Sequence, residues 1–307
     1  MSELTKVNDA WRAIEAAVPR WPIETVRVEH ASGRILAEAV GADRDQPPFD
    51  RVTMDGIAIA SAALASGTTR FPIAGVQAAG APASTLTRAD GCFEVMTGAV
   101  LPAGTDTVVP VEVIETADGV ATLTAPDEIM PGQFVHRQGT DYAAGDALLA
   151  AGTPLAAPEV AVLSSVGHAS VRVGGVPRVA VVSTGDELVA AGDAVLPHQI
   201  RRANDYAIAA ALRQRGVGTP AAVHLRDEPE AMRAAVADLL DASDVLILSG
   251  GVSKGRFDYL PGILDELGVV KAFHRVRQRP GKPMWFGTLG EKLVFALPGN
   301  PVSALVC

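Results

Sequence analysis

Cysteine is nearly absent from this chain, which carries only Cys92 and Cys307 among its 307 residues. One cysteine in each of two distant segments supports neither a disulfide framework nor a zinc site. The histidines show no metal-ligand spacing, and the sequence contains no HExxH or CxxC motif. We therefore expect a protein of the reducing cytoplasm.

Long apolar runs are also missing. No stretch approaches the ~20 consecutive apolar residues that a membrane span needs. Glu3, Asp9 and Glu15 interrupt the N-terminal segment, so residues 1–21 do not have the pattern of a signal peptide. A hydrophobic content of 48% with 20% charged residues is typical of a soluble globular protein. We expect no membrane partner.

Basic residues are too few to balance the acids, because 26 Lys and Arg stand against 35 Asp and Glu and the formal net charge is −9. This balance argues against a general footprint on nucleic acid or on an anionic membrane. An anionic small substrate fits only where local basic groups or backbone N–H groups outweigh the overall field.

The length and the changes in composition indicate two or three domains. Residues 5–17 have the spacing of an amphipathic helix. The residues expected near its apolar face are Val7, Trp11, Ile14 and Val18. Residues 45–140 are rich in Pro, Gly, Thr and Ala and hold short β-like runs.

From about residue 175, strand-like and helical segments alternate, which predicts a parallel α/β sheet. The expected helices are 204–215, 228–241 and 258–267. The expected strands are RVAVVST (178–184), TPAAVHL (219–225), DVLILSG (244–250), PMWFGTL (283–289) and KLVFAL (292–297). Ligands collect at the carboxyl ends of such strands. Here those ends are glycine-rich and polar: STGDEL (183–188), SGGVSKG (249–255) and LPGNP (297–301).

Two Asp-Gly pairs are candidates for hairpin turns. Asp118-Gly119 lies between TVVPVEVIET (107–116) and VATLTA (120–125), and it predicts a clean hairpin. Asp55-Gly56 lies in PPFDRVTMDGIAIA (47–60), where no clean strand precedes it because two prolines restrict the backbone. Asp55 is therefore either a turn residue or a carboxylate that a loop presents to a ligand.

The first strand-end loop has two interpretations. Asp186 and Glu187 follow a strand and a glycine, so they begin a helix, where acids complement the dipole, or they serve a site.

The second strand-end loop favours function. Gly250 and Gly251 offer backbone N–H groups to an anion. A Walker A motif is excluded, because Arg256 and Phe257 stand where Lys and Ser/Thr are needed. The structural alternative is a sharp turn capped by Asp258. The loop also holds three further polar residues, Ser253, Lys254 and Arg256.

The densest basic cluster lies in RVRQRPGK (275–282). Arg279 and Lys282 bracket a Pro-Gly turn and could face one phosphate group, although a solvated face is an equal alternative. The more favoured interpretation of Asp227 is that it belongs to the start of a helix. Asn300-Pro301 has the pattern of a helix N-cap and first helical position.

Seven segments, taken together, resemble one family. They are PPFDRVTMDGIAIA, MTGAVLPAGTDTVVPVE, RQGTDY, STGDEL, SGGVSKGRFDY, RPGKPMWFG and LPGNPVSA, in order between residues 46 and 304. This order and spacing resembles the MoeA proteins, the molybdopterin molybdenumtransferases, which are related to the E domain of gephyrin.

The resemblance implies an elongated homodimer of multi-domain subunits. It assigns 23–45 with 142–174 to a linking domain, 46–141 to a β-rich domain, and 1–22 with 175–307 to an α/β molybdopterin-binding domain. The family's C-terminal β domain is expected to be absent from this chain. The implied activity is insertion of molybdate into adenylylated molybdopterin with release of AMP, which depends on Mg²⁺. The adenylyltransferase of the same pathway is a candidate partner.

The resemblance also implies roles for residues that match the family's motifs. The implied catalytic acids are Asp55, Asp141, Glu187 and Asp258, of which Asp55, Glu187 and Asp258 are the implied Mg²⁺ ligands. The implied substrate-binding residues are Thr97, Asp227, Gly250, Gly251, Ser253, Arg279, Lys282, Pro298 and Pro301. Because clustered acids repel one another, we expect them to converge on one Mg–pyrophosphate site, either within a subunit or across a dimer interface.

The chain departs from the family pattern at two basic residues: Arg279 replaces a usual lysine and Arg202 a usual acid, although Asn204 is kept. Three alternatives stay open. They are the adenylylation step that precedes insertion, a non-catalytic scaffold of the gephyrin kind, and a paralogue that handles tungstate.

Overall fold

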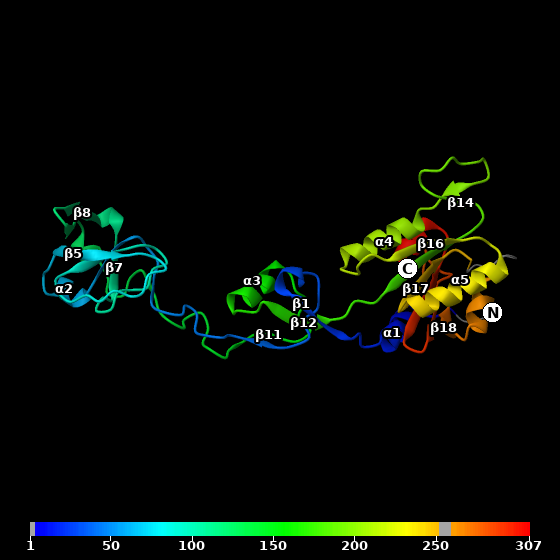
Figure 1. The fold of residues 1–307 in the computed structure, drawn as a ribbon, viewed down its shortest axis with the longest axis horizontal. Helices are drawn as coiled ribbons and strands as arrows, with labels where there is room; N and C mark the ends of the chain where they lie inside the picture. The colour runs from blue at the N-terminus through cyan, green and yellow to red at the C-terminus, as the bar shows by residue number, and fades with distance from the viewer. Residues whose placement is uncertain (1–3, 252–258) are drawn as a thin grey trace. The chain divides into compact units, whose positions relative to one another are not determined.

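The computed structural model describes residues 4–251 and 259–307, and the chain forms two compact units (Figure 1). Unit 1 comprises Met1–Ala37 with Val171–Cys307, and unit 2 comprises Glu38–Ser170. Both boundaries fall within the segments expected to form a linking domain, so the division into three domains stays a prediction.

A six-stranded sheet forms the centre of unit 1, in the order β16-β13-β17-β20-β19-β18. The first four strands run parallel, as expected: β16 (Ala221–Leu225), β13 (Val179–Thr184), β17 (Val245–Ser249) and β20 (Lys292–Leu297). The remaining two, β19 (Trp285–Leu289) and β18 (Val270–His274), are antiparallel, so the sheet is mixed and the expectation of a parallel sheet is confirmed for four of its six strands. Only two residues separate β19 from β20, and such a short connection forces antiparallel pairing.

Helices cover both faces of this sheet, which is why its strands are apolar at successive positions. Ala180 and Val182 of β13 face a core completed by α5 (Pro229–Ala242) and α6 (Leu260–Glu266). Val179 and Val181 belong to a second core with α1 (Val7–Ala17), α4 (Asn204–Gln214) and α7 (Pro301–Val306). Because side chains alternate across a strand, the two helical layers bury opposite residues of the same strands.

The helix predicted over 5–17 is confirmed as α1, but of the four residues predicted for its apolar face only Ile14 packs against the sheet. Trp11 is 60% exposed, and Val7 and Val18 are exposed as well. The face that packs on the sheet instead consists of Ala10, Ala13, Ile14 and Ala17. Small side chains let a helix approach a sheet closely, so alanine marked the buried face here.

The other predicted elements of unit 1 are confirmed within a few residues. Its remaining elements are β1 (Ile23–Arg27), η1 (Val28–His30), β12 (Ser170–Gly174, beginning at the unit boundary), β14 (Leu188–Val189) and β15 (Ile200–Arg201). Asn300 is the N-cap of α7, as expected, and its side chain accepts a hydrogen bond from the Ser303 N–H at 3.2 Å. Among the described residues, no helix is both long enough and apolar enough to cross a membrane.

Unit 2 is built on a second six-stranded sheet, in the order β7-β4-β6-β5-β9-β8. Its strands are β4 (Gly56–Ile59), β5 (Arg70–Gln77), β6 (Cys92–Val95), β7 (Thr107–Pro110), β8 (Ile114–Ala117) and β9 (Val120–Leu123). Its other elements are β2 (Val40–Gly41), β3 (Arg51–Val52), α2 (Ser61–Ala65), η2 (Val111–Val113), η3 (Pro126–Glu128), β10 (Val135–His136), β11 (Ala147–Leu149) and α3 (Ala157–Ser165).

The two Asp-Gly pairs have different structures. Asp118 and Gly119 both have positive φ, 51° and 73°, and they connect the paired strands β8 and β9, so this hairpin is confirmed. The hairpin alternative for Asp55-Gly56 is wrong, because β3 pairs with β10 while β4 pairs with β6 and β7. Asp55 is therefore the residue that leads into a central strand.

Candidate functional site

A cavity of about 510 Å³ lies at the carboxyl ends of the parallel strands in unit 1. Six residues implied by the family resemblance line it: Glu187, Asp227, Gly250, Gly251, Pro298 and Pro301. They come together because Ser183 on β13 pairs with Ser249 on β17, which pairs with Leu297 on β20, so three strands end at one level. The location agrees with the rule that ligands bind at this edge of an α/β sheet.

The two glycines of the second loop supply space. Gly250 and Gly251 have φ of 101° and 66°. A Cβ on Gly250 would lie 2.8 Å from Thr184 Oγ1. The expected anion nest needs correction at Gly250, because its N–H already donates to the Leu297 carbonyl at 3.1 Å. The buried Thr184 hydroxyl has no hydrogen-bond partner among the described residues, which leaves it able to contact a ligand.

Asn204 connects three parts of the cavity wall. Its side-chain N–H₂ donates to Ser249 Oγ at 2.7 Å and to the Gly299 carbonyl at 2.8 Å. Asn204 begins α4, so it holds the start of that helix against two strand-end loops. Asn204 is kept from the family pattern, but local sequence does not predict this role, which depends on contacts across 45 and 95 residues.

Glu187 and Asp227 bring carboxylates to the cavity. The alternative in which Asp186 and Glu187 begin a helix is wrong, because β14 follows and the Glu187 carbonyl accepts from the Ile200 N–H at 2.8 Å. The Glu187 carboxylate lies over Gly185, where a Cβ would meet Oε2 at 2.5 Å. The Asp227 N–H donates to Asp186 Oδ1 at 3.3 Å, which joins the two acidic loops.

The predicted basic pair lies outside the lining. Arg279 and Lys282 are exposed, and the neighbouring Pro283 lines the cavity instead. Arg201 and Arg202 are the cationic side chains in the described lining. Ser253 and Asp258 lie outside the described residues. The shared phosphate contact of Arg279 and Lys282 stays a prediction.

Unit 2 brings Asp55 and Thr97 into contact. The Thr97 backbone N–H donates to Asp55 Oδ1 at 2.6 Å, and the Thr97 hydroxyl donates to the same oxygen at 2.7 Å. These two hydrogen bonds, the backbone one first, lower the pKa of the exposed Asp55 carboxyl from its ordinary value. Asp55 is thus held as an ionised carboxylate at the surface.

We expect Thr97→Val to raise the pKa of Asp55 towards its ordinary value, because the hydroxyl bond is lost while the backbone bond remains. The stability that this bond contributes is present above the unfolded-state pKa and lost as the pH falls through the folded-state pKa. Carboxyl-carbon NMR titration measures the change. Asp106, whose partners are Ser61 and Thr107, serves as the internal control. An unchanged Asp55 pKa would contradict the assignment.

Asp141 takes part in a chain of polar contacts. His136 Nε2 lies 3.1 Å from Asp141 Oδ1, and Arg51 Nη2 lies 3.1 Å from His136 Nδ1. A guanidinium has donors only, so we assign Nδ1 as an acceptor and place the ring proton on Nε2, where it donates to Asp141. His136 therefore orients this predicted catalytic acid.

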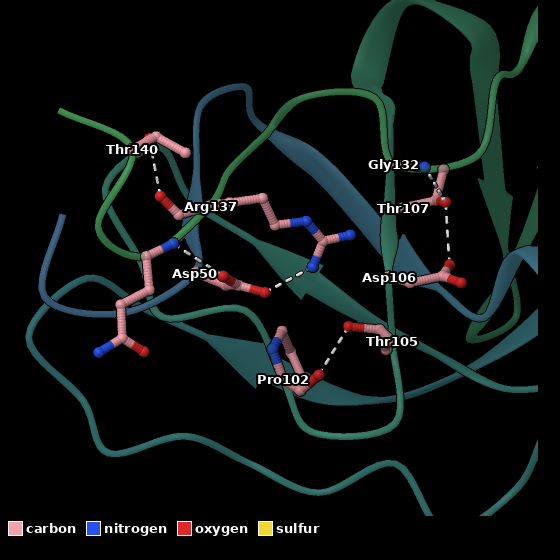
Figure 2. Close-up of polar contacts among 9 residues, drawn as sticks. Asp50, Pro102, Thr105, Asp106, Thr107, Gly132, Arg137 and Thr140 are labelled. Atoms are coloured by element: carbon pink, nitrogen blue, oxygen red, sulfur yellow. Dashed lines mark hydrogen bonds and ion pairs between the residues drawn. The ribbon is translucent and has the colours of Figure 1, made fainter.

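Asp50 holds the same loop at another point. Figure 2 shows the Arg137 guanidinium directed at the Asp50 carboxylate, and the two lie 2.5 Å apart. The Gln138 N–H donates to the second Asp50 oxygen at 2.9 Å. Desolvation raises the pKa of Asp50, but the bonds from Gln138 and Arg137 outweigh it and the net pKa is lowered. Asp50 therefore anchors the segment that carries Asp141.

The predicted acids are distributed over both units. Glu187 belongs to unit 1, whereas Asp55 and Asp141 belong to unit 2, so their convergence stays a prediction. Within the described residues, no group of three or more His, Cys, Asp or Glu side chains is placed to hold a metal ion by itself. Any metal at Glu187 and Asp227 would need further ligands from substrate or water.

Comparison with known proteins covers both units. Residues 5–167 match the family described as MoeA N-terminal region (domain I and II), and residues 180–307 match the probable molybdopterin binding domain. A molybdopterin molybdenumtransferase of Synechocystis sp. is 42% identical over 306 residues, which cover 99% of this chain and 78% of that protein. The Bacillus subtilis molybdopterin molybdenumtransferase is 31% identical, covering 98% of this chain and 71% of its own length.

A solved structure has the same architecture. The molybdopterin biosynthesis MoeA protein of Pyrococcus horikoshii superposes with a TM-score of 0.80 at 31% identity, covering 99% of this chain and 76% of that one. The match extends over both units, so it supports more than a shared α/β sheet. The chain therefore belongs to the MoeA family, the molybdopterin molybdenumtransferases of molybdenum cofactor biosynthesis.

Proposed function

We propose that this chain inserts molybdate into adenylylated molybdopterin and releases AMP, with Mg²⁺ as the cofactor. The observation that carries the proposal is the cavity at the carboxyl ends of the parallel strands, lined by Glu187 and Asp227, in a chain 42% identical to a molybdopterin molybdenumtransferase. A volume of about 510 Å³ is in the range of small-molecule sites.

The donor set of the cavity suits Mg²⁺. This ion prefers oxygen ligands, keeps several waters, and binds through one or two carboxylates plus substrate phosphates. Glu187 and Asp227 supply such carboxylates, and the buried Thr184 hydroxyl supplies a further oxygen. When bound, the ion neutralises phosphate charge and activates water.

The chain's own residues bind and orient the substrate in this proposal. Asn204 holds the strand-end loops in place, and Gly250 and Gly251 let the second loop approach Thr184 closely, because a side chain at either position would collide with its neighbours. Arg279 and Lys282 attract the anionic substrate from outside the lining.

Further parts of the proposal concern assembly and location. The proposal includes a role for Asp55 and Asp141 in the same reaction, either from the same chain or from the second subunit of a homodimer. A cytoplasmic location is supported by the scarcity of cysteine.

The direct test supplies the purified chain with adenylylated molybdopterin, Mg²⁺ and molybdate, and follows AMP by chromatography. We expect AMP release that requires the protein and falls to background when EDTA replaces Mg²⁺. Tungstate in place of molybdate tests the choice of oxyanion.

Two results would favour the alternatives. A requirement for ATP and unmodified molybdopterin would favour adenylylation. Full cofactor maturation by Asp55→Ala, together with a tightly bound protein partner, would favour a scaffold.

A further inference from the structure

Arg202 lies in the cavity wall beside a buried acid. Its side chain is 16% exposed, and its Nε lies 3.7 Å from Oδ2 of Asp205, whose side chain is fully buried. Arg202 precedes α4 and Asp205 lies in the first turn of that helix. The position of the guanidinium is therefore fixed by a charge that solvent does not screen.

The guanidinium has hydrogen-bonding capacity left over. Its buried Nε faces Asp205, and at 3.7 Å the two form an ion pair rather than a hydrogen bond, so that Nε and both Asp205 oxygens have no hydrogen-bond partner among the described residues. Its Nη2 lies 3.5 Å from the Tyr206 hydroxyl, a weak contact, and the guanidinium carbon lies 5.7 Å from the Tyr206 ring centroid. The group is thus held in position by contacts that leave its strong donors unused.

An anion bound in this cavity needs a cationic donor, because two acids line the same cavity. Glu187 and Asp227 would repel the anion if no positive charge offset theirs. Arg201 also lines the cavity, but it is exposed and donates to the Asp193 carbonyl at 3.2 Å. Arg202 is the less exposed and more firmly held of the two cations, so it is the better ligand for a negative group.

We propose that Arg202 binds a tetrahedral oxyanion in this cavity, with Asp205 as the positioning residue that holds the guanidinium. The proposal rests on the proposed function, which supplies two such oxyanions, the phosphoryl group of the nucleotide and molybdate. Both match the planar fork of an arginine, which donates parallel hydrogen bonds to two oxygens.

A purely structural role for Arg202 is the competing explanation, because a buried carboxylate needs a positive partner. The two roles differ in how a charge-removing substitution changes the affinity of the cavity for its ligands. A structural defect lowers the affinity for every ligand to a similar extent. Loss of an oxyanion contact lowers the affinity for ligands that carry the oxyanion and leaves the affinity for the neutral nucleoside unchanged.

The experiment compares the intact chain with Arg202→Gln by calorimetric titration of AMP, adenosine and molybdate. We expect the affinity for AMP, or for molybdate, to fall about tenfold or more while the affinity for adenosine stays within twofold. The ligand whose affinity falls, AMP or molybdate, identifies the oxyanion that Arg202 binds. Arg213→Gln on α4 removes the same charge from an exposed position outside the cavity, and we expect it to bind like the intact chain.

The outcomes separate the two proposals. Suppose that the intact chain binds AMP or molybdate. The oxyanion role is overturned if Arg202→Gln binds both ligands with the same affinity as the intact chain. It is also overturned if the substitution lowers the affinities for AMP and adenosine to the same extent. If the intact chain binds neither AMP nor molybdate, both proposals fail. Should Arg202→Gln not fold, Arg202→Gln/Asp205→Asn leaves no unpaired buried charge and must show the same selective loss.

Discussion

Glu187→Gln is expected to lower the rate of AMP release by at least about a hundredfold, with little change in stability. Glutamine keeps the shape of the side chain and one oxygen but removes the charge that the proposed site needs to hold Mg²⁺. The Glu187 backbone is fixed by the bond from Ile200, which the substitution leaves intact. The rate is measured from AMP formed at saturating substrate, and the unfolding midpoint from a thermal scan.

Asp193→Asn is the matched control. It removes one carboxylate from the same connection between β13 and α4, at an exposed residue that does not line the cavity. We expect its rate to stay within twofold of the intact chain. Equal rates for Glu187→Gln and Asp193→Asn would overturn the assignment of Glu187.

Gly56→Ala is expected to destabilise unit 2 by about 3 kcal/mol, because the added methyl group collides with backbone in a packed sheet. A Cβ on Gly56 would lie 1.9 Å from the Val109 carbonyl oxygen, and the φ of Gly56 is 155°. The collision disrupts the pairing of β4 with β7. Urea unfolding followed by circular dichroism measures the loss.

Gly67→Ala separates the collision from backbone strain. Gly67 also has positive φ, 91°, but nothing lies within 4 Å of its Cβ position. We therefore expect Gly67→Ala to cost only about 1 kcal/mol, from the left-handed conformation alone. Equal costs for the two substitutions would show that the close approach to Val109 carries no energy of its own.

The sequence predicted most of unit 1, because its elements follow from local patterns. Buried parallel strands appear as continuous apolar runs, and Met232, Val236 and Leu240 mark the inner face of α5. The error in strand direction was avoidable: Gly290 and Glu291 are the only residues between β19 and β20, and two residues with glycine first are typical of a hairpin turn.

Other features could not be predicted from the sequence, because they depend on contacts between distant residues. TVVPVEVIET was expected as a single β-like run but divides into β7, η2 and β8. Thr184 lies in the STGDEL motif and Asn204 is kept from the family pattern, but their contacts, like those of Asp205, come from what the fold buries around them. The family motifs identified six residues of the cavity lining, but they did not reveal that the Gly250 N–H is already bonded.

The division of unit 1 between the two ends of the chain has a consequence for folding during synthesis. Residues 38–170 are contiguous, so every residue of unit 2 has been synthesised before β13 is made. The N-terminal segment of unit 1 cannot complete its contacts until later residues have been synthesised, because Thr5 pairs with Val276 and the Ala37 N–H donates to the Arg172 carbonyl. Unit 2 therefore forms first, and α1 remains without its sheet until the last strands emerge.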